Sequence, residues 1–161
     1  MLQIGDKVVY PMHGAGEITG IEEYDVMGQG KMRPYYVLKM PIGDMKIMLP
    51  ADNIDSVGLR QVSPPEMRSK IEAVLRDAPV KAVGSWNKRF HANLDRLKTG
   101  DILEVAAVAR NLALQGLEKK ISSGEQRLLD TAKQILLSEM IFVLDSTPES
   151  AEAWLEKMLL R

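Results

Sequence analysis

The sequence predicts an α+β protein: a small antiparallel β-barrel at the N-terminus, followed by an all-helical part of about five helices. Two observations support this class. Up to about residue 59, short runs of β-branched and aromatic residues alternate with turns that contain glycine or proline, as in small antiparallel barrels. From residue 60 onwards, apolar residues recur at helical spacing behind residues that commonly cap helices. We therefore expect two domains, residues 1–59 and residues 60–161.

Four segments of the first part have the character of strands. They are residues 7–10, a segment framed by Ile18 and Ile21 that ends at Tyr24, residues 35–40 and residues 45–49. Glycines predict turns at residues 27–30 and 41–44. The strand at residues 45–49 lies between two prolines, which is typical of a strand at the edge of a sheet. Such an edge either pairs with a strand of a partner protein or is an ordinary edge, which Lys46 protects.

Cap residues place the helices of the second part. The expected caps are Ser63, Ser85, Asp101, Ser122 and Thr147, and the first four helices run to about residues 77, 98, 115 and 143. Two of these caps have the spacing of a capping box, Ser63 with Glu66 and Ser122 with Glu125. Residues 79–84 form a linker, and Gly116 is expected to break or bend the third helix.

The composition excludes several classes of site. The chain has no cysteine, so it has neither disulfides nor thiolate metal sites, and its two histidines do not favour a histidine metal centre. No apolar run approaches ~20 residues, so we expect no membrane-spanning helix. The N-terminus lacks the basic and apolar regions of a signal peptide, which indicates a cytoplasmic protein.

No group of residues indicates catalysis. The loop at residues 10–16 contains Gly14 and Gly16 but lacks the spacing of a phosphate-binding loop. His13 is expected to be a turn residue with local hydrogen bonds. The remaining serines and carboxylates are accounted for as caps and solvated faces. We therefore expect no enzymatic activity, no cofactor and no small-molecule substrate.

Trp86 stands out because it begins a helix beside two cations, Lys88 and Arg89. An exposed aromatic plate flanked by cations suits nucleic acid, since cations hold phosphates and the plate presses on bases. The charge distribution agrees: residues 60–98 carry nine Lys/Arg and four Asp/Glu, whereas the chain as a whole carries −1. The alternative is that Trp86 covers the core at the helix start. Trp154 lies in an apolar helical set and is expected in the core.

Taken in order along the chain, these motifs resemble the CarD (CdnL-type) family of bacterial transcription regulators. The resemblance rests on residues 5–14 (GDKVVYPMHG), 36–39 (YVLK), 49–53 (LPADN), 86–94 (WNKRFHANL), 99–101 (TGD) and 123–127 (SGEQR). Any one of these motifs is weak, but their combination over nearly the whole length is specific.

The resemblance implies a Tudor-like RNA polymerase-interacting domain, similar to one in the transcription-repair coupling factor, and a DNA-binding helical domain. The first would dock on the β subunit of bacterial RNA polymerase by pairing an edge strand, which falls on Met45, Lys46, Ile47, Met48 and Leu49. The second would contact promoter DNA at the upstream edge of the melted region and stabilise the open complex. The residues there are Trp86 as a minor-groove wedge, with Asn87, Lys88, Arg89 and His91 beside it.

Two positions depart from the family pattern. The family often has a basic residue at the position of Met48, so strand pairing rather than a charge pair would carry more of the docking. It also often has lysine at the position of His91, and a histidine is largely neutral near pH 7, which implies one weaker phosphate contact. An alternative function is a protein-only adaptor, in which the two parts bind two protein partners and Trp86 is a protein hot spot.

Overall fold

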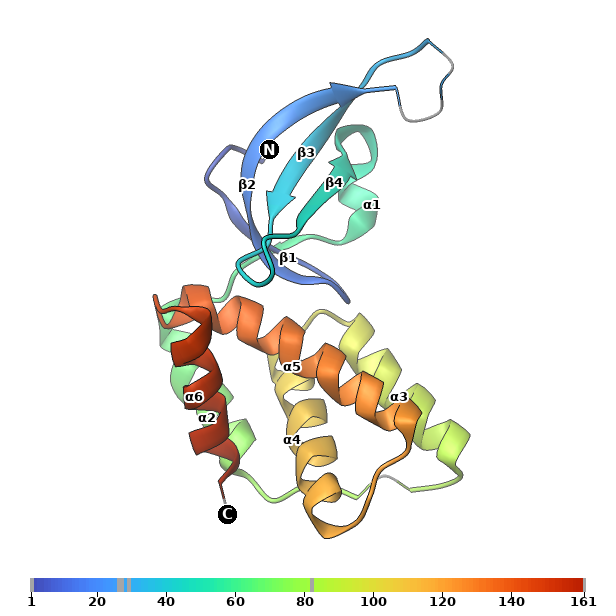
Figure 1. The fold of residues 1–161 in the computed structure, drawn as a ribbon, viewed down its shortest axis with the longest axis vertical. Coiled ribbons are helices and arrows are strands. Elements are labelled where there is room, and N and C mark those ends of the chain that lie inside the picture. The colour runs from blue at the N-terminus through green and yellow to red at the C-terminus, as the bar shows by residue number, and fades with distance from the viewer. Residues whose placement is uncertain (1, 26–27, 29, 82, 161) are drawn as a thin grey trace.

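The computed structural model of the protein describes all residues except 1, 26–27, 29, 82 and 161. Figure 1 shows a curved β-sheet at one end of an elongated molecule and a group of helices at the other. The predicted α+β class is confirmed, with strands first and helices second. The turn predicted at residues 27–30 includes Met27 and Gln29, which lie outside the described residues.

Five antiparallel strands form the sheet in the order β4-β3-β2-β1-β5. Their bounds are β1 Lys7–Tyr10, β2 Gly14–Tyr24, β3 Arg33–Lys39, β4 Lys46–Pro50 and β5 Arg60–Gln61. A bulge between Ile18 and Gly20 interrupts the register of β2 and β3 and favours the curvature of the sheet. All four predicted strands are present. The fifth, β5, was not predicted, because two polar residues are too short to show an alternating pattern.

The sheet encloses a small apolar core of its own. The buried side chains are Val8, Ile18, Tyr36, Leu38, Met40 and Leu49. Between β4 and β5 the chain forms a short 3₁₀ turn (η1, Ala51–Asn53) and helix α1 (Ile54–Val57), whose apolar side chains pack against this core. The sheet therefore has two outer strands, β4 and β5, and β4 has a free edge because it pairs with β3 alone among the described strands.

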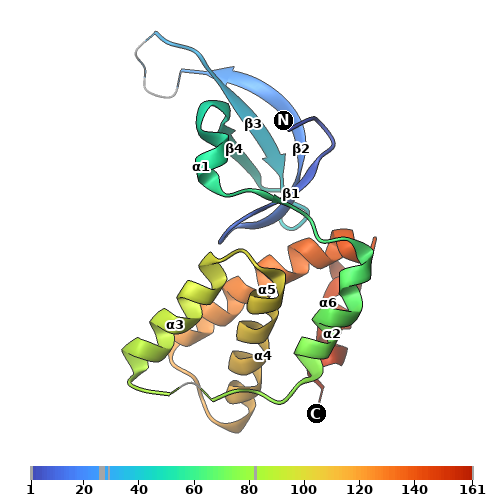
Figure 2. The ribbon, with the colours of Figure 1, turned by 180° about the vertical axis from the view of Figure 1, so that it is seen from behind.

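Helices build the second part around a central helix. The elements are a 3₁₀ turn (η2, Pro65–Met67), α2 (Arg68–Arg76), α3 (Trp86–Lys98), α4 (Ile102–Glu118), α5 (Ser123–Val143) and α6 (Pro148–Leu159). Helix α4 contacts α2, α3, α5 and α6, and Figure 2 shows it between α3 and α2. None of the described helices has the length and apolar character needed to span a membrane.

Four of the five predicted helix caps are confirmed. Ser85, Asp101, Ser122 and Thr147 each accept a hydrogen bond from a backbone N–H of the first helical turn. The capping box predicted at Ser63 was wrong. Residues 65–67 form a 3₁₀ turn without a side-chain cap, and α2 begins only at Arg68. The N–H of Ser63 donates instead to the carboxylate of Glu139, so this residue belongs to a tertiary contact.

Gly116 was predicted to break or bend the third helix. It does not break the helix, because α4 continues through it to Glu118. A glycine inside a helix costs about 1 kcal/mol relative to alanine. Helix α4 buries Leu112 and Leu114 just before this point, and tertiary packing outweighs a local cost of this size.

The hairpin between β1 and β2 rests on α5 and joins the two parts. The N–H of Ala15 donates to the buried Oγ of Ser138 at 2.8 Å. Gly14 lies so close to α5 that a Cβ placed on it would be 2.5 Å from the same oxygen, and its φ is +107°. Only glycine satisfies both conditions. His13 in the hairpin loop stacks on Tyr10 and bonds the carbonyl of Pro11, as expected for a turn residue.

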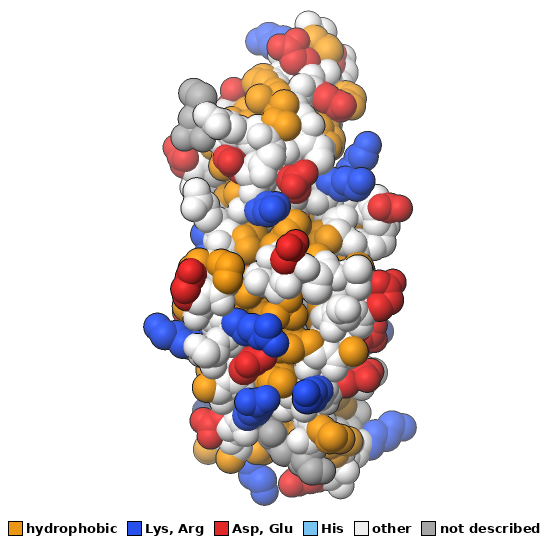
Figure 3. All heavy atoms as spheres, turned by 90° about the vertical axis from the view of Figure 1, so that its left-hand side faces the viewer, with side chains coloured by type: hydrophobic (Ala, Val, Ile, Leu, Met, Phe, Trp, Pro, Cys, Tyr) orange, Lys and Arg blue, Asp and Glu red, His pale blue; other side chains and the backbone are white. Residues whose placement is uncertain are grey.

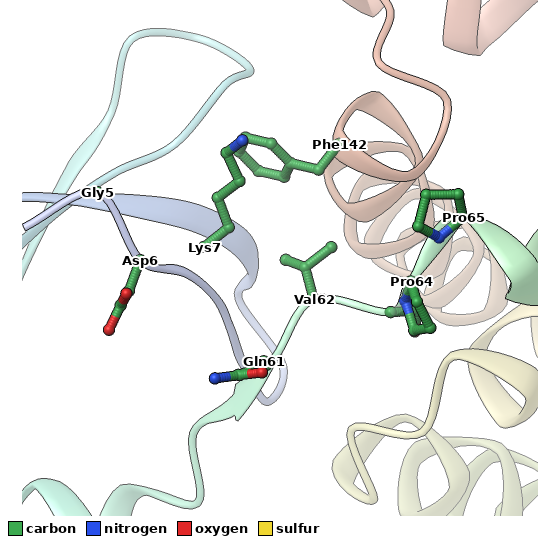
Figure 4. A pocket seen from close by; sticks show the side chains of 9 residues that line it. Gly5, Asp6, Lys7, Gln61, Val62, Pro64, Pro65 and Phe142 are labelled. Atoms are coloured by element: carbon green, nitrogen blue, oxygen red, sulfur yellow. The ribbon is translucent and has the colours of Figure 1, made fainter. Parts of the chain in front are cut away.

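An ion pair with one buried member fixes the same junction, since the side chain of Arg60 is 31% exposed and that of Glu139 is buried. Glu139 of α5 is fully buried, and its two oxygens accept from the guanidinium of Arg60 in β5 at 2.6 and 2.9 Å. The Nε of Arg60 donates to the carbonyl of Gly100 at 2.8 Å. A buried carboxylate is costly unless it is paired and hydrogen-bonded, so this pair favours one angle between sheet and helices. Figure 4 shows a further contact, with the Lys7 side chain beside the ring of Phe142.

Trp154 lies in the helical core, as predicted, with 9% of its surface exposed. Its indole N–H donates to Oε2 of Glu72 on α2 at 2.7 Å. This hydrogen bond, together with nearby Arg68, lowers the pKa of Glu72. Because the folded protein favours the charged carboxylate, the contribution of this contact to stability is present near neutral pH and is lost as the pH falls through the lowered pKa.

Candidate nucleic-acid interface

The five residues predicted to contact DNA all lie in the first two turns of α3. Ser85 caps this helix and accepts from the N–H of Lys88 at 3.3 Å. Trp86 is therefore the first helical residue, and its side chain is 40% exposed. Asn87, Lys88 and His91 are exposed as well, and Arg89 is half-buried. The sequence thus located an accessible aromatic side chain with cations beside it.

Three contacts hold the indole of Trp86 in place. Its ring stacks on Phe90, one turn later, with centroids 5.1 Å apart and an interplanar angle of 14°. Its Nε1 donates to Oγ of Ser122 at 3.0 Å. The ring also covers Gly124 of α5, where an added Cβ would be 3.1 Å from Cζ2 of the indole. The exposed part of the ring is therefore a fixed plate rather than a freely rotating side chain.

The contact on α5 is itself built on a capping box. Oγ of Ser122 accepts from the N–H of Glu125 and bonds a carboxylate oxygen of Glu125, both at 3.1 Å. Glu125 is buried and also accepts from the side-chain amide of Gln115 on α4. The position of Trp86 therefore depends on Ser122 and Glu125, which lie more than 30 positions away in the chain. Local sequence patterns cannot show this link, although residues 123–127 were part of the motif that suggested the family.

The two predicted cations differ in how they are held. The guanidinium of Arg89 donates to the carbonyl of Gly84 at 3.0 Å. The Lys88 side chain passes over Gly84, where an added Cβ would be 3.3 Å from Cδ of the lysine. His91 contacts the ring of Phe90 edge-on. Among the described residues, no salt bridge neutralises Lys88 or Arg89, so both charges are available to a polyanion.

A further cation at this end of α3, Lys119, was missed from the sequence. Lys119 and Lys120 lie in the segment that leads from α4 to Ser122. Along the chain the basic excess lies in residues 60–98, whereas residues 99–161 carry seven Lys/Arg against ten Asp/Glu. A charge count along the chain cannot detect that the fold brings Lys119 to the same pocket as Arg89 of α3. Within the described residues, no three His, Asp or Glu side chains gather as a metal site would need.

The strand predicted to dock on a partner is β4, and it is an outer strand of the sheet. Lys46 is exposed, Ile47 and Met48 are half-buried, and Met45 just before the strand is 51% exposed. Leu49 is different, because its side chain is in the core of the sheet with 2% exposed. Its backbone, but not its side chain, lies at the free edge.

Comparison with known proteins agrees with both halves of this structure. Residues 2–63 match the CarD-like/TRCF RID domain, and residues 70–156 match the CarD C-terminal domain. The chain is 34% identical over 154 residues to "Putative transcription factor YdeB" of Bacillus subtilis (strain 168), covering 96% of this chain and 99% of that protein. It is 28% identical over 152 residues to the transcription-repair-coupling factor of Staphylococcus haemolyticus (strain JCSC1435), covering 94% of this chain but 11% of that much longer protein. The chain therefore belongs to the CarD family of transcription factors, with an N-terminal Tudor-like sheet and a helical C-terminal part.

Proposed function

We propose that this transcription regulator docks on the β subunit of bacterial RNA polymerase through β4 and contacts promoter DNA through the start of α3. The DNA contact is at the upstream edge of the melted region, and it stabilises the open complex. The protein acts in the cytoplasm, by binding and without an enzymatic step. The observation that carries this proposal is the indole of Trp86, which is exposed, fixed by three contacts and flanked by cations.

Docking on polymerase is supported by the free edge of β4. An outer strand offers unpaired backbone groups to a strand of a partner. Residues 2–63 match the CarD-like/TRCF RID domain, and the resemblance implies that this domain binds the β subunit. Met48 carries no charge, so backbone pairing supplies the affinity, with exposed Met45 as an apolar contact.

The fixed junction supports joint action of the two parts. We propose that residues 1–59 bind polymerase and residues 60–161 bind DNA, although Arg60 and Gln61 add β5 to the sheet. Binding of β4 to polymerase raises the local concentration of α3 at the promoter. Because Arg60, Glu139 and Ser138 hold the junction, Trp86 is presented at a fixed distance from β4. Weak intrinsic affinity for DNA is then sufficient.

The indole acts as a wedge in this proposal. A base step widened by melting exists only in the open complex, so a residue that fills it favours the open state over the closed one. Contact between an aromatic side chain and a base is worth ~1–3 kcal/mol, which corresponds to roughly a ten- to hundredfold shift of the equilibrium. Lys88 and Arg89 hold the backbone and add little sequence preference.

The proposal is tested by the lifetime of open complexes. Polymerase holoenzyme is bound to a promoter with and without the full-length protein, and dissociation is followed after a competitor is added. We expect the protein to lengthen the open-complex lifetime roughly ten- to hundredfold, because the contact between the indole and a base is worth ~1–3 kcal/mol. An unchanged lifetime, with the protein still bound to polymerase, would favour the adaptor function and a protein partner for Trp86.

A further inference from the structure

A pocket of about 420 Å³ lies beside the candidate interface and is lined by three cations. Lys81 belongs to the segment between α2 and α3, Arg89 to α3, and Lys119 to the segment that follows α4. Asn111 and Gln115 line the same pocket. Since the cations come from three separate segments, the fold brings them together.

The charge of this pocket is positive. Glu118 also lines it, so the three cations and one carboxylate give a formal charge of +2. Within the part of the chain that the structure describes, no salt bridge involves Lys81, Arg89 or Lys119. The bond from Arg89 to the carbonyl of Gly84 orients the guanidinium and uses one of its five N–H donors.

The pocket and the indole occupy the same end of the helical part. Arg89 follows Trp86 by three residues, and Lys119 precedes Ser122, the hydrogen-bond partner of the indole, by three. Figure 1 shows the segment before α3 and the loop between α4 and α5 at this end. The face of α2 and α6 differs, because Lys and Arg are interspersed there with Asp and Glu (Figure 3).

We propose that this pocket is a second contact to the DNA backbone, which binds a phosphate near the base step that Trp86 enters. This inference rests on the proposed function. A phosphate offers several oxygens to charge-assisted hydrogen bonds from guanidinium and ammonium donors. A backbone phosphate, rather than a separate small anion, is favoured because the pocket adjoins an exposed aromatic plate. Two contacts, one to a base and one to a phosphate, fix the position of the helical part along the DNA.

The test is a salt titration of DNA binding by the full-length protein. The probe is a fluorescent promoter duplex with an unpaired bubble, and binding is measured by anisotropy at several NaCl concentrations. Lys81→Gln and Lys119→Gln each remove one cation from the pocket, and Glu118→Gln removes its carboxylate. Lys70→Gln on α2 is the matched control, because Lys70 is also an exposed lysine.

We expect each pocket lysine variant to flatten the plot of log K against log [salt] by about 0.9, which corresponds to about eightfold in affinity between 1 M and 0.1 M salt. Glu118→Gln should bind more tightly, and Lys70→Gln should behave as the wild type. The pocket assignment is overturned if Lys81→Gln and Lys119→Gln keep the wild-type slope while Lys88→Gln flattens it. If the wild-type protein shows no salt-dependent binding at all, the proposed function fails and the pocket assignment fails with it.

Discussion

The indole nitrogen of Trp86 donates a hydrogen bond to the hydroxyl of Ser122, which lies 36 residues later in the chain. The same hydroxyl caps α5. One serine therefore both begins the longest helix and orients the aromatic plate at the start of α3. A side chain that is already held in place loses little conformational freedom on binding, so this arrangement favours a wedge that acts without reorganisation.

Gly124 of α5 allows the indole of Trp86 to lie close to this helix. Replacing this glycine should change the position of the indole without lowering the stability of the fold. In Gly124→Ala the new Cβ would be 3.1 Å from the ring, so the indole must shift. Alanine is favourable in a helix, by up to about 1 kcal/mol, so the protein stays folded. We expect a changed NMR signal of the Trp86 indole N–H and a severalfold shorter open-complex lifetime.

The control for that variant is Gly116→Ala, because Gly116 also lies inside a helix but has no other atom within 4 Å of the added Cβ. It should raise the free energy of unfolding by a similar amount and leave the open-complex lifetime unchanged. Equal open-complex lifetimes for Gly124→Ala and Gly116→Ala would show that the stability of the open complex does not depend on the exact position of the indole.

Lys88 and Arg89 supply the charge beside the wedge. The double variant Lys88→Glu with Arg89→Glu should weaken binding to bubble DNA and reduce the salt slope by about 0.9 for each phosphate that the protein no longer neutralises. The control reverses two exposed lysines on α2 and α6, Lys70→Glu with Lys157→Glu, for the same change in net charge. If both double variants weaken binding equally, the effect is one of total charge, and the interface is not at α3.

Ile47 is the second residue of β4, and substitutions of it test whether the free edge of β4 docks on polymerase. A charge or a proline there, as in Ile47→Asp or Ile47→Pro, should abolish co-elution with polymerase, because pairing at the free edge is interrupted. Circular dichroism should show the helices intact. Ile21→Asp on β2 is the control, since Ile21 is 52% exposed but lies on a strand that has neighbours on both sides. Retained binding of the Ile47 variants would place the docking strand elsewhere.

A substitution of Glu139 tests whether its ion pair with Arg60 holds the sheet and the helices together. Glu139→Gln keeps the shape but removes the charge that faces Arg60. Because the Arg60 side chain is 31% exposed, the remaining cation stays partly solvated, and losing the charge-assisted hydrogen bonds costs about 1.5–3 kcal/mol. We expect a loss of this order in the free energy of unfolding, measured by urea denaturation. The control is Glu104→Gln, which breaks the partly exposed pair of Glu104 with Arg96 and should cost less than about 1 kcal/mol. Similar losses for the two variants would show that the Arg60–Glu139 pair does not hold the junction.

The elements of this fold were largely predictable from local patterns. Four strands and four caps follow from residue types at fixed spacings, and the start of α3 at Trp86 follows from Ser85. The capping box at Ser63 and the break at Gly116 fail to form for one reason. A tertiary contact, the buried Glu139 in the first case and the packing of α4 in the second, outweighed a local preference of about 1 kcal/mol.

The candidate site was only partly predictable for the same reason. Trp86, Lys88 and Arg89 are neighbours in sequence, so their proximity was evident. Ser122, Gly124 and Lys119 reach the site only through the packing of α3 against α4 and α5. No periodicity or charge count in a single sequence reports which distant segments become neighbours.

The central claim is that Trp86 stabilises the open promoter. The most direct measurement is bubble collapse on a promoter with a fluorescent reporter in the melted region, with polymerase and either wild-type protein or Trp86→Ala. Wild-type protein should slow the collapse roughly ten- to hundredfold, and Trp86→Ala should bind polymerase equally well but lose this effect. If Trp86→Ala slows the collapse as much as wild type does, the indole is not the wedge and the proposed mechanism is wrong.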